Sequence, residues 1–377
     1  MIRFLLQIIG IAGMMFVVLA FLSEDTILDA PDLFYKKQQP NISQAATPVV
    51  TLPAETLEEP VLVQETVELP SPSQEEAGKT PQIQDIPSNE SFYPFPPASL
   101  ETLNVNARAA LVNILCKTSG GILRPISGSG VIIDPSGVIL TNAHVAQYVL
   151  LASSQMVDLS CIMRTGSPAM GTWMADVLYI PSAWVAEHAE DIRKTRPLGT
   201  GEHDYALLLI TGMANGSPLP SVFPYLPVET RSISRVDDRA LLAAYPAEFS
   251  GGNATQNTLS ASSAVTTIKE LLTFYENTVD LISFGGVVLA QSGSSGGAVV
   301  NEWGLLVGII STTSDGETTA DRDLRAITTS YVNRSLVAST GTTLGEILNK
   351  DVTAETAAFM QTKGKVFAQL IVDQLAQ

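Results

Sequence analysis

Residues 289–300, LAQSGSSGGAVV, place Ser295 in a run of small residues and glycines. A serine hydroxyl is a weak nucleophile at neutral pH, and it becomes reactive when a base takes its proton and a third group orients that base. The sequence offers three histidines as bases: His144 in LTNAHVAQ, His188 in WVAEHAEDIRK and His203 in GTGEHDYALLLI. The first question is therefore which histidine, and which carboxylate, could serve the serine.

Asp204 precedes the apolar run YALLLI, so a strand would carry this carboxylate to the edge of a core, where an aspartate needs a partner. The alternative is that Asp204 caps a local turn. With His144 and Ser295 the chain order is His, Asp, Ser, one of the three known orders of this triad. The segment 293–297, GSSGG, also fits the G-x-S-x-G pattern of α/β-hydrolases, but there the histidine follows the serine, and none follows His203.

These segments resemble one family. TNAHV around His144, DYALL at Asp204 and GSSGG around Ser295 resemble the trypsin-like serine peptidases, most nearly the bacterial Deg/HtrA branch, over about residues 104–335. The resemblance implies an all-β fold of two six-stranded antiparallel β-barrels, the first carrying the histidine and the aspartate and the second the serine. It also implies that Ser295 attacks a peptide carbonyl, His144 transfers the proton and Asp204 orients the imidazole.

The resemblance also implies a substrate site. Backbone N–H groups of Gly293 and Ser295 would form an oxyanion hole. The residue six before the nucleophile lies at the base of the specificity pocket in this family, and here it is apolar, which favours small or medium aliphatic side chains. The strand at 308–313 would bind an extended peptide through its backbone. The substrate-binding residues expected are Leu289, Ala290, Ile310, Ser311 and Thr312.

Two departures from the family limit what the resemblance implies. Ser294 stands where the digestive enzymes have an aspartate that receives a clipped N-terminus, so activation by clipping is not expected. Nothing after residue 340 is strand-rich enough for a PDZ domain, so trimer formation and peptide-triggered activation are not implied. The sequence does not indicate an oligomeric state.

Short β-type runs separated by Gly, Pro, Asn and Ser favour an all-β fold from residue 104 onward. The expected peptidase domain is 104–340, with its two barrels divided near 215–225. Residues 341–377 have apolar positions at helical spacing. This C-terminal helix is expected to pack on a barrel, and an oligomer contact is the alternative.

The N-terminal segment 1–23 contains an uncharged, largely apolar run from Phe4 to Leu22, with Arg3 before it. Such a run is long enough to cross a membrane. The positively charged residue before it is expected to stay on the cytoplasmic side, which places the rest of the chain outside. A cleaved signal peptide is the alternative. We expect a single-pass protein of the cell membrane with its catalytic domain on the extracytoplasmic side.

Residues 24–103 form the expected tether. From residue 38 to 100 there are eleven of the 22 prolines, nine acidic residues and a single basic one, Lys79. Such a composition cannot bury enough apolar surface to fold, and it predicts a disordered linker. The segment SFYPFPP at 91–97 is a candidate for docking on the folded part.

The formal net charge of −17 and the lack of a basic patch exclude nucleic acid as an expected partner. Cys116 and Cys161 are the only cysteines, and an exported protein favours a disulfide between them over two buried thiols. No ligand spacing indicates a metal, and no cofactor is expected.

The sequence thus predicts a membrane-tethered serine endopeptidase that hydrolyses extracytoplasmic polypeptides through an acyl-enzyme. The alternative is a catalytically silent pseudo-peptidase that uses the barrels as a peptide-binding module.

Overall fold

The computed structural model describes most of the chain beyond residue 92. The described residues are 93–118, 123–194, 200–247, 258–274, 277–313 and 318–375. The chain divides into two compact units, 1–83 and 84–377, and every described residue belongs to the second unit. The expected anchor, 1–23, lies outside the described residues. Within them, no helix combines the length and the apolar character needed to span a membrane.

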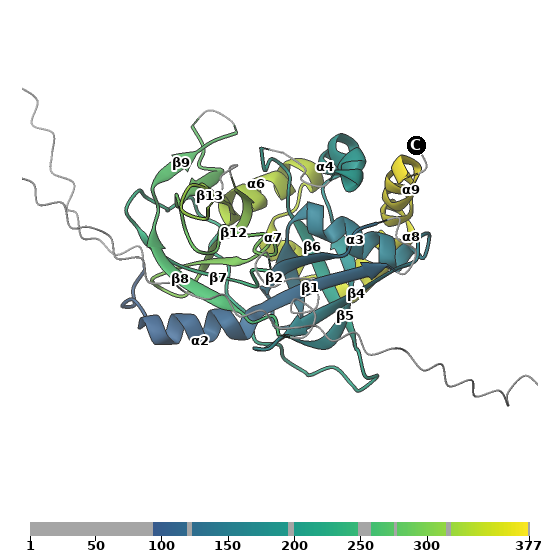
Figure 1. Ribbon diagram of the computed structural model, residues 1–377, viewed down its shortest axis with the longest axis horizontal. Coiled ribbons are helices and arrows are strands. Elements are labelled where there is room, and N and C mark those ends of the chain that lie inside the picture. Colours follow the sequence, from purple (N-terminus) through teal and green to yellow (C-terminus); the bar gives the residue numbers. More distant parts are fainter. Residues whose placement is uncertain are drawn as a thin grey trace, which may run out of the picture. The chain divides into compact units, whose positions relative to one another are not determined.

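The last part of the expected linker, 93–103, is ordered on the folded unit. The buried Tyr93 donates its hydroxyl to Glu229 at 2.7 Å. Helix α2 (Leu100–Ala110) begins at Ser99, whose hydroxyl accepts the N–H of the third helical residue, and it contacts β7 and β11 of the second sheet (Figure 1). The folded unit therefore begins before residue 104, and the rest of the linker lies outside the described residues.

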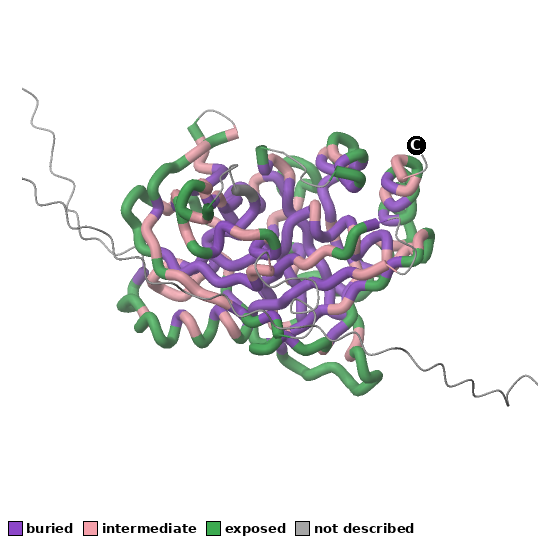
Figure 2. Tube along the Cα trace, viewed as in Figure 1, coloured by how far each residue is buried: buried purple, intermediate pink, exposed green. Residues whose placement is uncertain are grey.

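The first β unit is the expected closed six-stranded antiparallel barrel, with strand order β1-β2-β3-β6-β5-β4. Its strands consist mostly of buried residues, because each turns side chains toward the barrel interior or toward the helices that cover it (Figure 2). The strands are β1 (Leu111–Thr118), β2 (Ile126–Ile132), β3 (Val138–Thr141), β4 (Leu159–Thr165), β5 (Met170–Tyr179) and β6 (Ala206–Met213).

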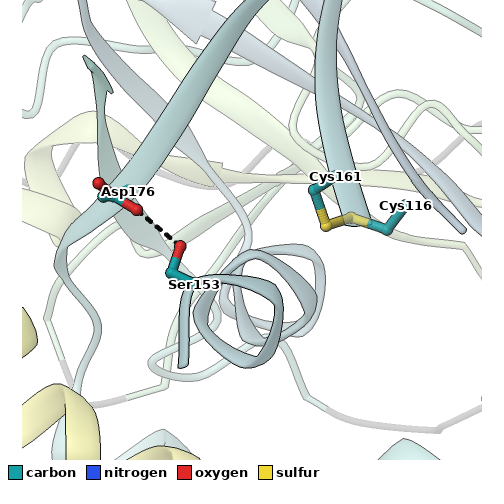
Figure 3. The surroundings of a disulfide bond; sticks show 4 residues. All are labelled: Cys116, Ser153, Cys161 and Asp176. Carbon is teal, nitrogen blue, oxygen red and sulfur yellow. Dashed lines mark hydrogen bonds between the residues drawn. A yellow bond between two sulfur atoms is a disulfide. The ribbon is translucent and has the colours of Figure 1, made fainter. Parts of the chain in front are cut away.

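The disulfide expected from the cysteine pair is present in this barrel. The pairing of β1 with β4 places Cys116 directly opposite Cys161, with their Cα atoms 4.1 Å apart and their sulfurs bonded (Figure 3). Ser153 of the neighbouring helix donates to Asp176 at 2.6 Å beside it. The alternative of two unbonded thiols is therefore wrong.

The second β unit departs from the expected closed six-stranded barrel. It is a seven-stranded antiparallel sheet of order β8-β7-β11-β12-β13-β10-β9. Its strands are β7 (Arg239–Ala244), β8 (Ser262–Thr267), β9 (Glu270–Leu272), β10 (Leu281–Ser283), β11 (Ala298–Asn301), β12 (Leu306–Thr313) and β13 (Leu324–Thr328).

The bend between the edge strands explains this difference. Ile268 donates its N–H to Asp238, next to β7, at 3.0 Å, and the following Lys269 donates to Ser283 of β10 at 2.7 Å. Successive N–H groups of an extended chain point in opposite directions, so two residues transfer the pairing from one side of the sheet to the other. One bent segment, 262–272, thus supplies both edges of the sheet.

Helices cover the outside of the first barrel and of the second sheet. The C-terminal segment, expected as one helix, is divided into α7, α8 and α9, because capping residues start new helices: Thr343 forms a capping box and Asp351 accepts two N–H groups. Helix α8 contacts β5 and β6, and α9 contacts α3 and η1, so the segment packs on the first barrel (Figure 1). The described residues after 341 contain no PDZ domain. The remaining elements are α3 (Ala143–Ser154), α4 (Ser182–His188), η1 (Ala189–Arg193), α6 (Thr329–Thr340), α7 (Leu344–Leu348), α8 (Val352–Gln361) and α9 (Lys363–Leu375).

The two β units share one hydrophobic core in addition to the core of each. Tyr205 and Leu140 of the first barrel pack in one buried cluster with Ala298 and Ile309 of the second sheet. The end of β3, the start of β6 and the start of β11 are thereby brought to a common boundary.

Candidate active site

His144 and Asp204 are brought together by the pairing of β3 with β6. Thr141 at the end of β3 lies opposite Ala206 at the start of β6. The chain that leaves β3 into α3 and the chain that enters β6 therefore lie side by side. Asn142, the residue before α3, donates its side-chain amide to the Asp204 carbonyl at 2.9 Å and joins the two segments.

The Asp204 carboxylate is held at both oxygens. The Nδ1 atom of His144 lies 2.8 Å from Oδ2 and 3.1 Å from Oδ1, and the backbone N–H of His144 donates to Oδ1 at 2.9 Å. Ser311 donates its hydroxyl to Oδ2 at 2.9 Å. The carboxylate side chain is 8% exposed and the imidazole is 30% exposed, so the buried acid supports a ring that reaches solvent.

The two groups shift each other's pKa in opposite directions. Burial by itself raises the pKa of the Asp204 carboxyl, but the charge of His144 and the hydrogen bonds from His144 and Ser311 lower it more, and the net direction is downward. Burial lowers the pKa of His144, but the carboxylate charge and its hydrogen bond raise it more, and the net direction is upward. With Nδ1 engaged by a carboxylate, Nε2 is left as the nitrogen that accepts a proton in the neutral ring.

Ser295 lies in the loop between β10 and β11, and Ser311 connects it to this pair. The Ser295 hydroxyl donates to the Ser311 carbonyl at 3.4 Å, while the hydroxyl of the same Ser311 donates to Asp204. This contact, rather than one with His144, is the hydrogen bond of the Ser295 hydroxyl among the described residues. The structure therefore brings the serine and the His–Asp pair to one residue of β12.

The N–H groups of the residues on either side of Ser294 have no hydrogen-bond acceptor among the described residues. These residues are Gly293 and Ser295, and neighbouring N–H groups of the loop are bonded. Gly293 has φ +92°, a left-handed conformation that costs glycine little. We call these two groups the oxyanion-hole N–H groups, because N–H groups on either side of one residue match the arrangement that binds a developing oxyanion.

Glycines 296 and 297 are required by close packing. A Cβ atom at Gly296, which has φ +84°, would fall on the Ser129 carbonyl and 2.5 Å from Oγ1 of Thr141. At Gly297 it would meet the Ala243 carbonyl at 2.7 Å. A side chain at either position would therefore collide with backbone atoms packed behind the serine.

The expected substrate-binding residues lie in different environments. Leu289 and Ala290 are fully buried in the core of the second sheet. The N–H and the carbonyl of Ile310 are both bonded to the serine loop, at 2.8 and 2.7 Å, so they are not available to a peptide. The register of β12 against β13 breaks between Ile310 and Thr313, which leaves Ser311 and Thr312 outside that ladder. The side chain of Thr312 lies outside the described residues.

The other two histidines lie elsewhere. His188 pairs through Nδ1 with Asp191 at 2.8 Å and stacks on Trp184. His203 faces α6, where its Nδ1 lies 3.2 Å from the Tyr331 hydroxyl and 3.3 Å from that of Ser335. In the part of the chain that the structure describes, no group of three or more His, Cys, Asp and Glu side chains could hold a metal ion.

The sequence reasoning missed two polar residues of the site. Ser311 was assigned to substrate binding, yet its hydroxyl holds the carboxylate. Asn142 was not singled out, although a polar residue just before a helix and two before a histidine was a visible signal. For Ser311 the only signal was a small polar residue at the end of an apolar strand.

One protein family matches the part of the chain that contains this site. Residues 128–309 match the family model of the trypsin-like peptidase domain. Among solved structures, the chain is similar to the crystal structure of the serine endoprotease from Yersinia pestis, with 19% sequence identity and a TM-score of 0.42, over 67% of this chain and 70% of that chain. A search of curated proteins found no match.

The segment that the family model matches contains His144, Asp204 and Ser295. It also contains the whole of the loop 293–297 and the first half of β12, the strand that carries Ser311. The match supports a trypsin-like peptidase domain over residues 128–309, and with it the enzyme class of the serine endopeptidases.

Proposed function

We propose that this protein is a membrane-tethered serine endopeptidase that cleaves extracytoplasmic polypeptides with Ser295, His144 and Asp204 as its catalytic triad. The observation that carries the proposal is the double contact of Ser311. Its hydroxyl donates to the Asp204 carboxylate and its carbonyl accepts from the Ser295 hydroxyl, so the nucleophile and the carboxylate that holds the base meet at one residue.

In the acylation step, the Ser295 oxygen bonds to the scissile carbonyl carbon and its proton passes to Nε2 of His144. The carbonyl oxygen becomes an oxyanion that the N–H groups of Gly293 and Ser295 stabilise. When the tetrahedral intermediate collapses, the C–N bond breaks, and His144 gives its proton to the leaving amine. Asp204 supports the positive charge of the ring at the intermediate stage, which its hydrogen bonds to Nδ1 favour.

Deacylation repeats this sequence with water. Water loses a proton to Nε2 of His144 and attacks the ester carbon, and Ser295 leaves as the proton returns to its oxygen. This step requires the Ser295 oxygen to come within about 2.6–3.2 Å of Nε2, a contact that often forms only when substrate binds. To make this contact the hydroxyl would break its hydrogen bond to the Ser311 carbonyl, which at 3.4 Å is long and weak.

The proposed substrate is an extended polypeptide. Two consecutive residues, Ser311 and Thr312, lie outside the ladder between β12 and β13 beside the serine, so their backbone groups are the candidates for pairing with a peptide. The proposed preference for small or medium aliphatic side chains next to the scissile bond rests on the sequence position of the apolar Leu289 and Ala290 before the nucleophile.

The proposed tether is the segment 1–23, joined to the folded unit through the linker. The disulfide between Cys116 and Cys161 supports an oxidising compartment, where such bonds persist. Recovery of the full-length protein from carbonate-washed membranes, with its N-terminal peptide intact, would support the anchor. A soluble form that begins at Phe21 would contradict it and would favour a cleaved signal peptide.

A fluorophosphonate probe tests the enzymatic proposal. The folded protein should lose labelling in the Ser295→Ala variant, and mass spectrometry should find the wild-type label on the peptide that contains Ser295. Heat-denatured wild-type protein is the control, because it has the serine without the arranged base. If the intact folded protein does not label, a peptide-binding module without catalysis is the better description.

A further inference from the structure

Ser129 is a buried serine of β2 that the triad does not use. It is fully buried, and all of its polar atoms are bonded. Its N–H donates to the Ser295 carbonyl at 2.7 Å and its carbonyl accepts from the Thr141 hydroxyl at 2.7 Å. Its own hydroxyl donates to the Gly293 carbonyl at 2.7 Å and accepts the N–H of Tyr245 at 2.9 Å. One residue of the first barrel thus contacts the serine loop at two carbonyls.

The two carbonyls on the same peptide units as the oxyanion-hole N–H groups are also held. The carbonyl of Ser292 accepts the N–H of Ala247 at 2.8 Å, and that of Ser294 accepts the N–H of Gly297 at 2.9 Å. Because a peptide unit is planar, fixing its carbonyl also fixes the direction of its N–H. Each oxyanion-hole N–H is therefore aimed by a backbone hydrogen bond on the opposite side of its own unit.

The peptide unit between these two is held on both sides: its N–H, that of Ser294, donates to the Gln291 carbonyl at 3.2 Å, and its carbonyl, that of Gly293, accepts from the Ser129 side chain. It links Gly293 to Ser294 and joins the two peptide units that carry the oxyanion-hole N–H groups. A rotation of this unit would change the direction of one N–H relative to the other. With φ +92° and no Cβ, glycine can turn this unit over at small cost. The hydroxyl of Ser129 opposes that rotation through its bond to the carbonyl, and the bond of the same hydroxyl to Tyr245 fixes the hydroxyl in turn.

We propose that Ser129 is a positioning residue that keeps the two oxyanion-hole N–H groups convergent through the bond of its hydroxyl to the Gly293 carbonyl. The inference rests on the proposed function. It means that a residue of the first barrel helps to set the conformation of a loop that belongs to the second sheet. Ser129 does not touch substrate in this scheme. It acts through the loop.

Replacement of the hydroxyl tests this role. Loss of one oxyanion donor lowers kcat by about 10²–10³-fold, so a residue that only orients the donors should cost less, and we expect Ser129→Ala to lower kcat roughly 10- to 100-fold. The KM for a chromogenic peptide nitroanilide should stay within about threefold, because ground-state contacts are unchanged. The pH at the midpoint of the acid limb of kcat/KM should not move, because Ser129 does not contact His144 or Asp204.

A second readout separates positioning from a general loss of structure. A peptide aldehyde forms a hemiacetal whose oxyanion occupies the hole, whereas the matching peptide acid does not. Ser129→Ala should weaken aldehyde binding by about the same factor as kcat/KM, because both report transition-state stabilisation, and should leave binding of the peptide acid unchanged. Equal loss for both ligands, or a fall in kcat with unchanged aldehyde binding, overturns the inference.

Ser127→Ala is the matched control. Ser127 is on the same strand, and its hydroxyl accepts the Asn113 amide at 2.9 Å without a contact to the serine loop. It should keep wild-type kcat. If Ser129→Ala does not fold, Ser129→Cys is measured instead. Its thiol is a much weaker donor than the hydroxyl, so kcat should fall, and a kcat equal to that of the wild type overturns the inference.

The failure of this inference is distinguishable from failure of the proposed function. If wild-type protein shows neither turnover nor fluorophosphonate labelling, both are overturned. If wild-type protein is active and Ser129→Ala keeps its kcat within about twofold, only the role of Ser129 is overturned.

Discussion

The first barrel and the second sheet supply the candidate catalytic residues from different kinds of backbone. His144 lies in α3 just after β3, and Asp204 lies just before β6. These two strands pair directly, so the ladder sets the separation of the two residues. Ser295 lies in a loop, and its position depends on hydrogen bonds from outside that loop. Side chains on paired elements are held more precisely than side chains on loops.

The difference teaches how this site is assembled. The barrel is closed, carries a disulfide across β1 and β4 and is covered by α3, α8 and α9. The second sheet is not closed by strand pairing, and the bent segment 262–272 forms both of its edge strands. The closed barrel carries the acid and the base, and through Ser129 it also contacts the loop of the second sheet at two carbonyls.

Removal of the nucleophile or the base should have the largest effect and is the sharpest test that both units form one site. Ser295→Ala and His144→Ala should each lower kcat by about 10⁶-fold, and the double variant should be little worse, because residues that act as a unit are not additive. Steady-state kinetics with a peptide nitroanilide measures this. A double variant as slow as the product of the two single effects would show that the two residues act independently.

Removal of the carboxylate charge should come next. Asp204→Asn should lower kcat by about 10⁴-fold, because the imidazole loses its required tautomer. The wild-type base must be neutral, so activity should rise with pH through a His144 pKa above its usual 6.5. Without the carboxylate that raises this pKa, the acid limb of kcat/KM should move to lower pH.

A pH–rate profile of wild type and Asp204→Asn makes this comparison. His188 forms a similar pair with Asp191 outside the candidate site. Asp191→Asn is therefore the control, and it should leave the pH of the acid limb unchanged. An acid limb that shifts in Asp191→Asn and not in Asp204→Asn would contradict the assignment of the base.

Removal of the disulfide tests how much the closed barrel depends on it. The bond closes a loop with a sequence separation of 45, for which the chain-entropy relation gives about 4 kcal/mol of the free energy of unfolding. The double variant Cys116→Ala, Cys161→Ala should therefore unfold at a lower urea concentration and keep most of its kcat while folded. An unfolding midpoint equal to that of the wild type would show that the strand ladder alone fixes the barrel.

The smallest effect is expected for His203→Ala. His203 precedes Asp204 in sequence, but its ring contacts Tyr331 and Ser335 of α6. The variant should keep kcat within about threefold and lose about 1 kcal/mol of stability from the lost hydrogen bonds. Kinetics and thermal unfolding of the same preparation measure both. An inactive His203→Ala beside an active His144→Ala would reverse the assignment of the base.

Local sequence was sufficient to predict the candidate site in outline. The motifs around His144, Asp204 and Ser295 combine a strand end, a polar or charged residue and glycines within a few positions, so their signals need no knowledge of the fold. The closed first barrel and the pairing of Cys116 with Cys161 also follow the expectation. The anchor and most of the linker stay predictions, because they lie outside the described residues.

Tertiary structure alone decided which other residues join the site. Ser311 and Ser129 are small polar residues in strands, and nothing in their neighbours distinguishes them from any solvent-facing serine. Their partners lie 107 and 164 positions away, and only the packing of one β unit against the other brings these groups within bonding distance. Tyr93, expected within a disordered tether, is likewise fixed by a buried carboxylate 136 positions away. A pattern of local propensities determines which elements form, whereas a hydrogen bond between distant residues exists only where the closed fold has already placed donor and acceptor together.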